Sequence, residues 1–116
     1  MYSKELTKGT LQPIILKLIS ESDKMYGYEI TQRVKEITQG KIDISEGALY
    51  PILHRMEAEK ILDTEKVFIG KRVRKYYKVT DSGKKAAIKV TAELNDFIET
   101  LSVIFNDKKA VYDFNG

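Results

Sequence analysis

A run of polar side chains between Ser45 and Arg55 is the first feature of the sequence that could do chemistry. Ser45, Tyr50 and His54 offer hydroxyl and imidazole groups, and Arg55 offers a guanidinium with several donors in one plane. A guanidinium suits a bidentate contact to guanine, and the hydroxyls or the imidazole suit bases or phosphates. These residue types indicate recognition of a nucleic acid.

A basic segment follows between Lys71 and Lys89, where eight residues are basic and only Asp81 is acidic. Its formal charge of +7 leaves −4 for the rest of a chain whose total is +3. A local basic stripe on a nearly neutral chain is typical of a phosphate-binding surface. The alternative is a solvated charged face. The residues expected to contact phosphates are Lys71, Arg72, Arg74 and Lys75.

The composition argues against several other classes of function. The chain has 116 residues, enough for one domain, with no Cys and a single His. Disulfides, thiolate metal sites and cysteine nucleophiles are excluded, and the sequence has no glycine-rich phosphate motif or metal-ligand cluster. We therefore expect neither catalysis nor a cofactor. No apolar run approaches the ~20 residues of a membrane span and the N-terminus does not resemble a signal peptide, so we expect a cytoplasmic protein without membrane contact.

Three helices and a hairpin are expected to position the polar and basic groups. Apolar residues recur every three or four positions over 10–22, 26–39 and 45–59, which predicts helices. Ser45 is the expected N-cap of the third helix. The segment 62–79 is expected to form a hairpin, because the two residues Gly70-Lys71 in its middle suit a type II′ turn. Residues 42–44, between the second and third helices, are expected to form an edge strand or an extended connection.

The last expected helix, over 81–106, is too long for a small body to cover. It extends roughly 37–39 Å at 1.5 Å per residue, with apolar residues spaced as in the heptads of paired helices. An exposed apolar stripe calls for a partner, and we expect a second copy of the chain. The alternative is a monomer folded back on this helix. We expect residues 107–116 to form a flexible tail. The expected interface residues are Leu11, Ile15, Val90, Leu94, Phe97, Ile98, Leu101, Ile104 and Phe105.

The order helix, helix, helix, hairpin, helix is that of a winged helix-turn-helix, a mainly α fold of the α+β class. On this interpretation residues 1–80 form the DNA-binding domain, and its third helix lies in the major groove. Two alternatives stay open, namely His54 as an ordinary surface histidine and Tyr50 packed against the wing. The expected DNA-facing residues of the third helix are Ser45, Gly47, Ala48, Tyr50, Pro51, His54 and Arg55.

Three motifs occur in order along the chain. They are Tyr26-Gly27-Tyr28-Glu29-Ile30, the run from Ser45 to Glu57, and Arg74-Lys75-Tyr76-Tyr77-Lys78-Val79-Thr80 followed by Gly83. Together they resemble the PadR family of transcriptional regulators, in the order and spacing of that family, over about residues 9–105. The resemblance implies a bacterial regulator, usually a repressor, that binds a partly palindromic operator as a dimer. It also implies that 45–55 reads DNA and that 81–105 exchanges contacts with the partner's N-terminal helix, as in the short subfamily with one C-terminal helix.

Two departures from the family limit what the resemblance implies. The hairpin loop is only Gly70-Lys71, where many members carry a longer glycine-rich tip, so contact with the DNA backbone is implied but entry into the minor groove is not. The sequence also has no Trp. The drug-binding branch of the family stacks flat aromatic compounds on a tryptophan of the long helix, so no drug site is carried over. Phe97 is expected in the core or interface.

The sequence therefore predicts a homodimeric regulator that binds operator DNA, most often as a repressor. A small aromatic effector that releases the DNA is compatible with this prediction, although no residue identifies it. The second hypothesis is a winged-helix module that binds other proteins, because fold alone does not determine function. That module would need an apolar patch on the outer side of the third helix, where only Tyr50 and Pro51 offer one.

Overall fold

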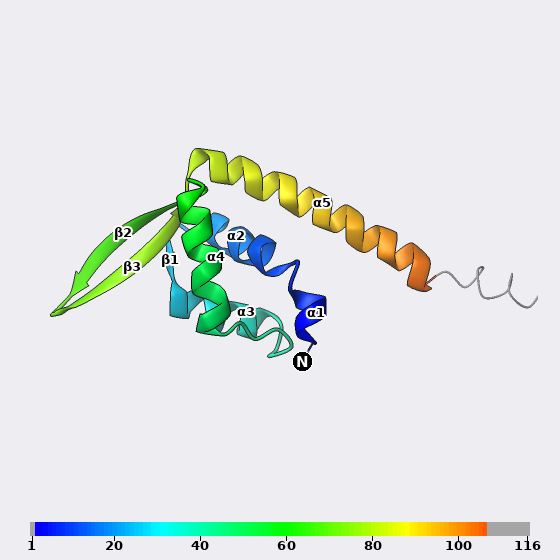
Figure 1. Cartoon of the computed structure of the whole chain (residues 1–116), viewed down its shortest axis with the longest axis horizontal. Helices are drawn as coiled ribbons and strands as arrows, with labels where there is room; N and C mark the ends of the chain where they lie inside the picture. Colours follow the sequence, from blue (N-terminus) through cyan, green and yellow to red (C-terminus); the bar gives the residue numbers. More distant parts are fainter. Residues whose placement is uncertain (1, 107–116) are drawn as a thin grey trace, which may run out of the picture.

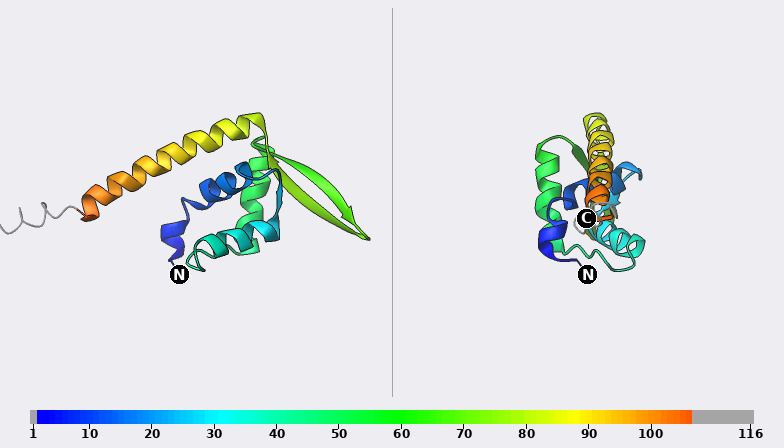
Figure 2. Two further views of the ribbon diagram at one scale, coloured as in Figure 1. Left: turned by 180° about the vertical axis from the view of Figure 1, so that it is seen from behind. Right: turned by 90° about the vertical axis from the view of Figure 1, so that its right-hand side faces the viewer.

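The computed structural model describes residues 2–106, which form a mainly helical body with a small antiparallel sheet (Figure 1). The elements in chain order are α1 (Lys4–Thr7), α2 (Leu11–Ser20), β1 (Met25–Tyr26), α3 (Gly27–Ile37), α4 (Glu46–Ala58), β2 (Leu62–Ile69), β3 (Arg72–Val79) and α5 (Asp81–Asn106). The wing β2–β3 and the helix α5 leave the body in opposite directions, as Figure 2 also shows. The predicted fold class is confirmed. The tail expected at 107–116 lies outside the described residues.

Side chains from four helices, the sheet and the connection before α4 form one hydrophobic core. Its members repeat every three or four residues along α2, α3 and α4, which explains why these segments form helices around a common centre. Burial of each large side chain stabilises the fold by about 1.5–3 kcal/mol. Ile15, expected at a dimer interface, has no exposed surface and belongs to this core. The core residues are Ile15, Leu16, Ile19, Met25, Ile30, Val34, Ile44, Leu49, Leu53, Met56, Leu62, Tyr77 and Ala87.

Local bonds and backbone angles set the ends of the helices. Ser45 Oγ accepts a hydrogen bond from Ala48 N at 3.2 Å and caps α4, as predicted. Thr80 Oγ1 accepts one from Gly83 N at 3.0 Å at the start of α5. Gln39 and Gly40, just past α3, have φ values of +53° and +79°, and left-handed residues end a helix. The start of α4 therefore follows from a residue type that the sequence displays, whereas the first left-handed residue after α3 is a glutamine.

The wing is an antiparallel hairpin with the predicted strands and turn. Ile69 pairs with Arg72, and Gly70 between them has a φ of +62°, which a type II′ turn requires at its first central residue. The base of the hairpin is buried, while its outer part carries exposed side chains and extends beyond the helices (Figure 1). The wing is thus anchored at one end only.

The sheet has a third strand, β1, that the sequence does not predict. Met25 pairs with Tyr77 and Tyr26 pairs with Tyr76, which gives the strand order β1-β3-β2. A strand of two residues is too short to show the alternation by which strands are recognised in a sequence. The second helix consequently begins at Gly27 and not at residue 26.

The N-terminal region differs from the single helix expected over 10–22. The long helix α2 is shorter at both ends, and the four-residue helix α1 precedes it, capped by Ser3, whose Oγ accepts from Leu6 N at 3.4 Å. None of the residues of α1 is buried, so no apolar periodicity marks it. The segment 42–44 is a connection and not a strand, and Ile44 inserts into the core.

Four parts of the chain meet at Lys60 and Ile61. Lys60 has a φ of +61°, and Ile61 N donates to Met56 O at 2.9 Å, which closes the end of α4. Thr80 Oγ1 donates to Lys60 O at 2.7 Å, and Thr80 N donates to Ile61 O at 3.1 Å. Gly83, in the first turn of α5, lies against Ile61. We call Lys60, Ile61, Thr80 and Gly83 the junction, because α4, both wing strands and α5 are joined there.

Only the first part of α5 packs on the body. Ala87 is buried and Val90 is half-buried where α5 crosses α2 (Figure 1). Beyond Leu94 every described residue of α5 is exposed. Polar residues interrupt the apolar ones, and within residues 2–106 no helix combines the length and the hydropathy needed to span a membrane. The exposed apolar residues of this second part are Phe97, Ile98, Leu101, Val103, Ile104 and Phe105.

We expect Gly83→Ala to destabilise the fold by about 1–3 kcal/mol, the usual cost of overpacking. An added Cβ would fall on the Ile61 carbonyl oxygen and lie 2.7 Å from Val79 Cγ1. The control is Gly47→Ala in α4, where the nearest atom, Ser45 Oγ, is 4.0 Å away. That change should stabilise the protein by up to about 1 kcal/mol. Urea unfolding measures both, and similar effects in the two variants would contradict the packing described for the junction.

Candidate functional site

A groove of about 510 Å³ opens where the start of α3, the exposed face of α4 and strand β3 meet. No carboxylate lines it among the residues that the structure describes. A concave surface with cations, hydroxyls and no acid suits an extended anionic ligand. We call it the α4–wing groove. Its polar lining consists of Tyr26, Tyr28, Tyr50, His54, Arg72, Arg74, Lys75 and Tyr77.

The exposed face of α4 carries mostly small residues along its middle. Gly47, Pro51 and His54 share this middle at 100° per residue, and all three are exposed. Two of them are small, so the backbone of α4 can come close to a partner. Ser45 is exposed at the helix start, whereas Ala48, also expected to face DNA, is half-buried against the core.

Longer side chains stand on the two flanks of this face. On the flank towards α2, Arg55 Nη2 donates to Gln12 Oε1 at 2.8 Å. On the flank towards α3, the ring of Tyr50 lies so close to Gly27 that a Cβ there would meet Tyr50 Cζ at 2.9 Å. Tyr50 therefore packs against the start of α3, and it also lines the groove beside the wing, with 37% of its surface exposed. The ring centroid of His54 is 6.2 Å from that of Tyr50.

Some basic residues of the wing are exposed at its tip. Others are engaged, which means that another side chain of the protein holds them. Lys71 and Arg72 are exposed at the tip. Arg74 is engaged, because its guanidinium lies 4.0 Å from the ring centroid of Tyr26. A cation over a ring face is attracted by the ring quadrupole, and the contact directs Arg74 into the groove.

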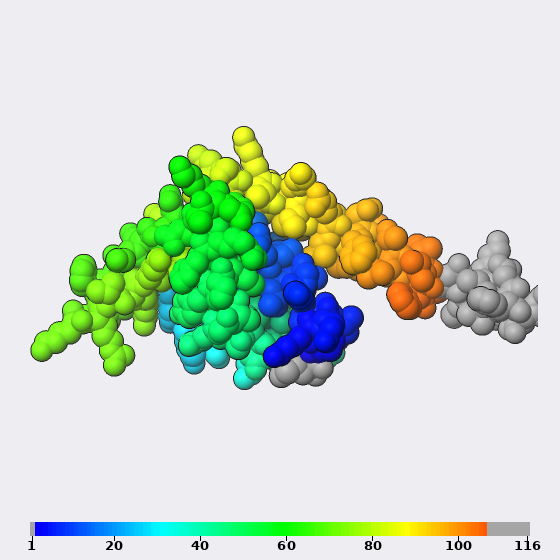
Figure 3. All heavy atoms as spheres, viewed as in Figure 1, coloured from blue at the N-terminus to red at the C-terminus, as the bar shows by residue number. Residues whose placement is uncertain are grey.

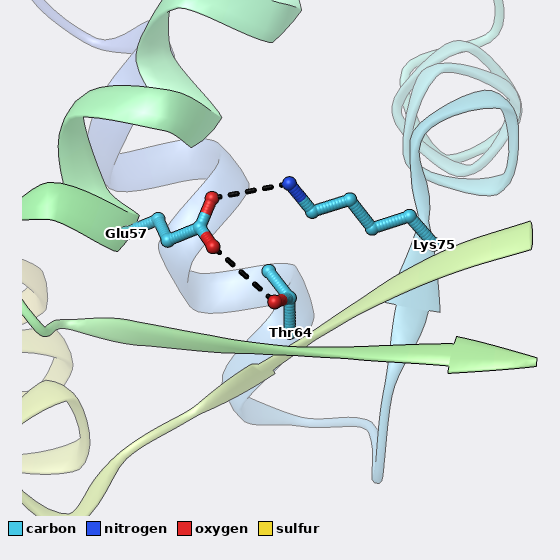
Figure 4. Close-up of polar contacts among 3 residues, drawn as sticks. All are labelled: Glu57, Thr64 and Lys75. Carbon is cyan, nitrogen blue, oxygen red and sulfur yellow. Dashed lines mark hydrogen bonds and ion pairs between the residues drawn. The ribbon is translucent and has the colours of Figure 1, made fainter.

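Lys75 is engaged as well, with Glu57 near the end of α4. Lys75 Nζ lies 3.2 Å from Glu57 Oε1, and Thr64 Oγ1 donates to Glu57 Oε2 at 3.2 Å (Figure 4). Burial is the largest single effect on Lys75 and disfavours its charged form, but the hydrogen bond to Glu57 and the charges of Tyr77 and Glu57 together outweigh burial and raise the pKa of Lys75. The expected phosphate contact of Lys75 competes with this pair, which ties the wing to α4.

The outer face of the sheet holds a second ion pair. Lys24 Nζ lies 3.0 Å from Glu65 Oε2, and the same ammonium lies 4.7 Å from the ring centroid of Tyr76. The hydrogen bond raises the pKa of Lys24 and lowers that of Glu65, so both groups stay charged at neutral pH. Tyr76 also meets Tyr26 edge-on, with 5.5 Å between the ring centroids. The negative charge of Glu65 is thus balanced by Lys24, which lies outside the wing. The tip of the wing keeps its positive charge.

The residues expected at a dimer interface do not form one cluster in the single chain. Leu11, Val90 and Leu94 are half-buried near the body, and Ile15 is in the core. The remaining five continue the same face of α5 beyond the body, where they are exposed, namely Phe97, Ile98, Leu101, Ile104 and Phe105. The structure thus separates them into a part covered by the chain itself and a part left open.

Sequence reasoning misses three residues that shape the site. Gly27 and Tyr28 line the groove at the start of α3, and Gln12 holds Arg55. The motif from Tyr26 to Ile30 contains the first two, but nothing in its spacing shows that it faces α4. Gln12 carries no sequence signal, because its role depends on how α2 packs beside α4.

Comparison with known proteins bears on what this site does. The family model described as "Transcriptional regulator PadR-like family" matches residues 15–89. Transcriptional regulator Rv3488 of Mycobacterium tuberculosis is 34% identical over 83 residues, which cover 72% of this chain and 74% of that protein. The structure of a transcriptional regulator from Clostridium thermocellum has a TM-score of 0.77 at 27% identity, over 90% of this chain and 98% of the other. Bacillus subtilis PadR, solved in complex with operator DNA, has a TM-score of 0.64 at 27% identity, over 70% of this chain and 46% of the other.

The Glu57 contacts give a prediction about how firmly the wing is held. Glu57→Gln should lower the free energy of unfolding by about 0.5–1 kcal/mol, because a half-exposed ion pair contributes little more. Glu59→Gln, an exposed position at the end of the same helix, is the control and should change it by less than about 0.5 kcal/mol. Thermal unfolding at low and high salt measures both. An unchanged stability for Glu57→Gln would mean that the pair does not hold the wing.

Proposed function

The chain belongs to the PadR-like family of transcriptional regulators, and on this premise we propose that it acts as a homodimeric repressor bound to a partly palindromic operator in the cytoplasm. Membership of this family makes it a regulator and not an enzyme. The observation that carries the proposal is the α4–wing groove, whose lining is cationic and free of carboxylates among the described residues. The relative from Bacillus subtilis binds operator DNA, which supports the same class of ligand here.

In this proposal α4 enters the major groove. A helix with its side chains is about 10–12 Å wide, and the major groove of B-DNA is about 12 Å wide. The small residues Gly47 and Pro51 let the backbone of α4 approach the base edges. Arg55 and Tyr50 then reach bases or phosphates from the two flanks, and His54 does so from the middle.

Phosphate contacts come from the wing and from the groove. Lys71 and Arg72 are exposed at the tip, and Arg74 is directed into the groove by Tyr26. Each phosphate contact adds affinity that is independent of sequence and falls with salt. Lys75 contributes least, because Glu57 holds its ammonium in the free protein.

The second part of α5 supports dimerisation. Its exposed apolar face continues the face that covers α2 in the same chain, so a second copy would extend an existing packing surface. A shallow groove of about 530 Å³ between α2 and α5, lined in part by Ala87, Thr91 and Ala92, offers room for a partner helix. A two-fold dimer places two copies of α4 on half-sites spaced by whole helical turns, which requires a palindromic operator.

Release from the operator would need an effector that binds better to a dimer geometry unsuited to DNA, since only differential affinity shifts such an equilibrium. The family resemblance favours a small aromatic compound for this role. A protein-binding module is the weaker candidate. The exposed face of α4 offers only Tyr50, Pro51 and Ala58 as apolar surface, and its neighbour is a cationic groove.

Arg55 tests whether α4 reads bases. Arg55→Ala should weaken binding to an operator, isolated by selection from random DNA, by about 1–3 kcal/mol and leave random DNA almost unaffected. Gln12→Ala is the control, because it removes the acceptor of Arg55 but keeps the guanidinium, and it should bind the operator at least as well as the parent. Fluorescence anisotropy measures DNA binding by the parent and by both variants. Equal losses on operator and random DNA would assign Arg55 to a phosphate.

The α5 face tests the dimer. Phe97→Asp combined with Leu101→Asp should convert the protein to a folded monomer in sedimentation, because both side chains are exposed in the single chain and share the apolar face. Val103→Asp is the control. Val103 is exposed on the opposite side of α5 at 100° per residue, and the same charge there should leave the dimer intact. A stable dimer after the double substitution would locate the interface elsewhere.

A further inference from the structure

The tip of the wing carries an apolar pair in open solvent. Phe68 is 75% exposed and Val73 is 51% exposed, and the two lie directly opposite each other in the hairpin register. A cross-strand pair of this kind stabilises a hairpin by less than about 1 kcal/mol, so packing within the wing does not require a large aromatic residue there. The tip is therefore a surface that can gain from a ligand.

The pair lies on the side of the wing that faces α4. Side chains alternate along a strand, so Phe68 shares a face with Thr64, and Val73 shares one with Lys75. Thr64 and Lys75 both bond to Glu57 of α4 (Figure 4). Val73 is in addition part of the lining of the α4–wing groove. The apolar pair thus continues the surface proposed to bind DNA.

The charges around the pair select its ligand. Five of the ten residues from 66 to 75 are basic and none is acidic. An anionic lipid surface would also attract these cations, but the pair adjoins the groove proposed to bind DNA, and this position favours DNA. DNA presents phosphates and the apolar faces of deoxyribose rings in alternation, and this matches a tip on which Lys66 shares the strand face of Phe68 and Lys71 lies in the turn.

We propose that the Phe68–Val73 pair packs on deoxyribose rings in the minor groove next to the major groove that holds α4. The inference rests on the proposed function and adds to it an apolar contact outside the recognition helix. Proteins that enter the minor groove frequently place apolar side chains there, often as wedges between base steps. The contact senses the width of that groove, so it adds preference for particular flanking sequences without a hydrogen bond to a base.

The shape of the wing permits this contact. Figure 3 shows the wing as a narrow arm on one side of the body. Its turn consists of Gly70 and Lys71 alone, so the end is only two strands wide. The minor groove of B-DNA is about 6 Å wide, which is narrower than a two-stranded ribbon with its side chains, so entry of the tip requires DNA that widens or bends there. The sequence implies contact with the DNA backbone only, because the loop is short. The exposed apolar pair favours a deeper position of this short tip in the minor groove.

Salt dependence separates this apolar contact from the ionic ones. Phe68→Ala should weaken operator binding about tenfold at every salt concentration and leave the slope of log Kd against log salt unchanged, because no phosphate contact is lost. Lys71→Ala is the matched control at the same tip, and it should reduce the slope by about one. Phe68→Leu keeps most of the apolar surface and should recover most of the affinity. Since Phe68 is exposed, all three variants should remain folded, and Phe68→Ala should lose at most the ~1 kcal/mol of its cross-strand pair.

Hydroxyl-radical footprinting on the selected operator reads the same contact directly, because it reports shielding of the sugars. The parent should protect minor-groove sugars on the flanks of the site, and Phe68→Ala should lose that protection but keep the central part of the footprint.

Parent-like affinity of Phe68→Ala, or no flank protection in the parent, would overturn the inference and leave the proposed function standing. Failure of the parent to prefer any DNA would instead refute the proposed function. Sedimentation that changes with Phe68→Ala while DNA binding does not would assign the tip to protein association and also overturn the inference.

Discussion

Short hydrogen bonds of the Lys60–Ile61 backbone connect α4, the wing and α5. The end of α4 closes on this segment, the wing begins directly after it, and Thr80 ties the end of the wing back to it. Gly83 then lets α5 start in contact with the same backbone. Because these links are short and partly buried, α4, the wing and α5 leave one point in set directions.

Charge and apolar surface are divided between the two ends that this junction separates. On one side, α4 and β3 enclose a groove lined by cations and hydroxyls, and near it Lys24 pairs with Glu65 and Lys75 with Glu57. On the other side, α5 carries exposed apolar residues beyond Leu94. A second copy that covers this α5 face would set the distance between two grooves. The geometry of the dimer and the fit to DNA are therefore linked through the junction, and a ligand that changes one would change the other.

The parts of the fold with strong periodicity were predictable from the sequence. The helix α5, the eight-residue strands around Gly70-Lys71 and the cap at Ser45 all come from local residue preferences, and the structure confirms them. The helix α1 and the strand β1 were not predictable, because they are short and depend on tertiary contacts. The side chain that each basic residue contacts was not predictable either. A sequence does not show that Glu57 holds Lys75, that Tyr26 supports Arg74 or that Gln12 holds Arg55, since each pair joins elements far apart in the chain.

Selection of bound sequences from a random DNA library tests the central claim most directly, because it asks at once whether the chain reads DNA and whether it does so as a symmetric dimer. The account predicts enrichment of an inverted repeat whose half-site centres lie one helical turn, about 10 bp, or a multiple of it apart. No enrichment over successive rounds, or enrichment of a sequence without two-fold symmetry, would contradict the account.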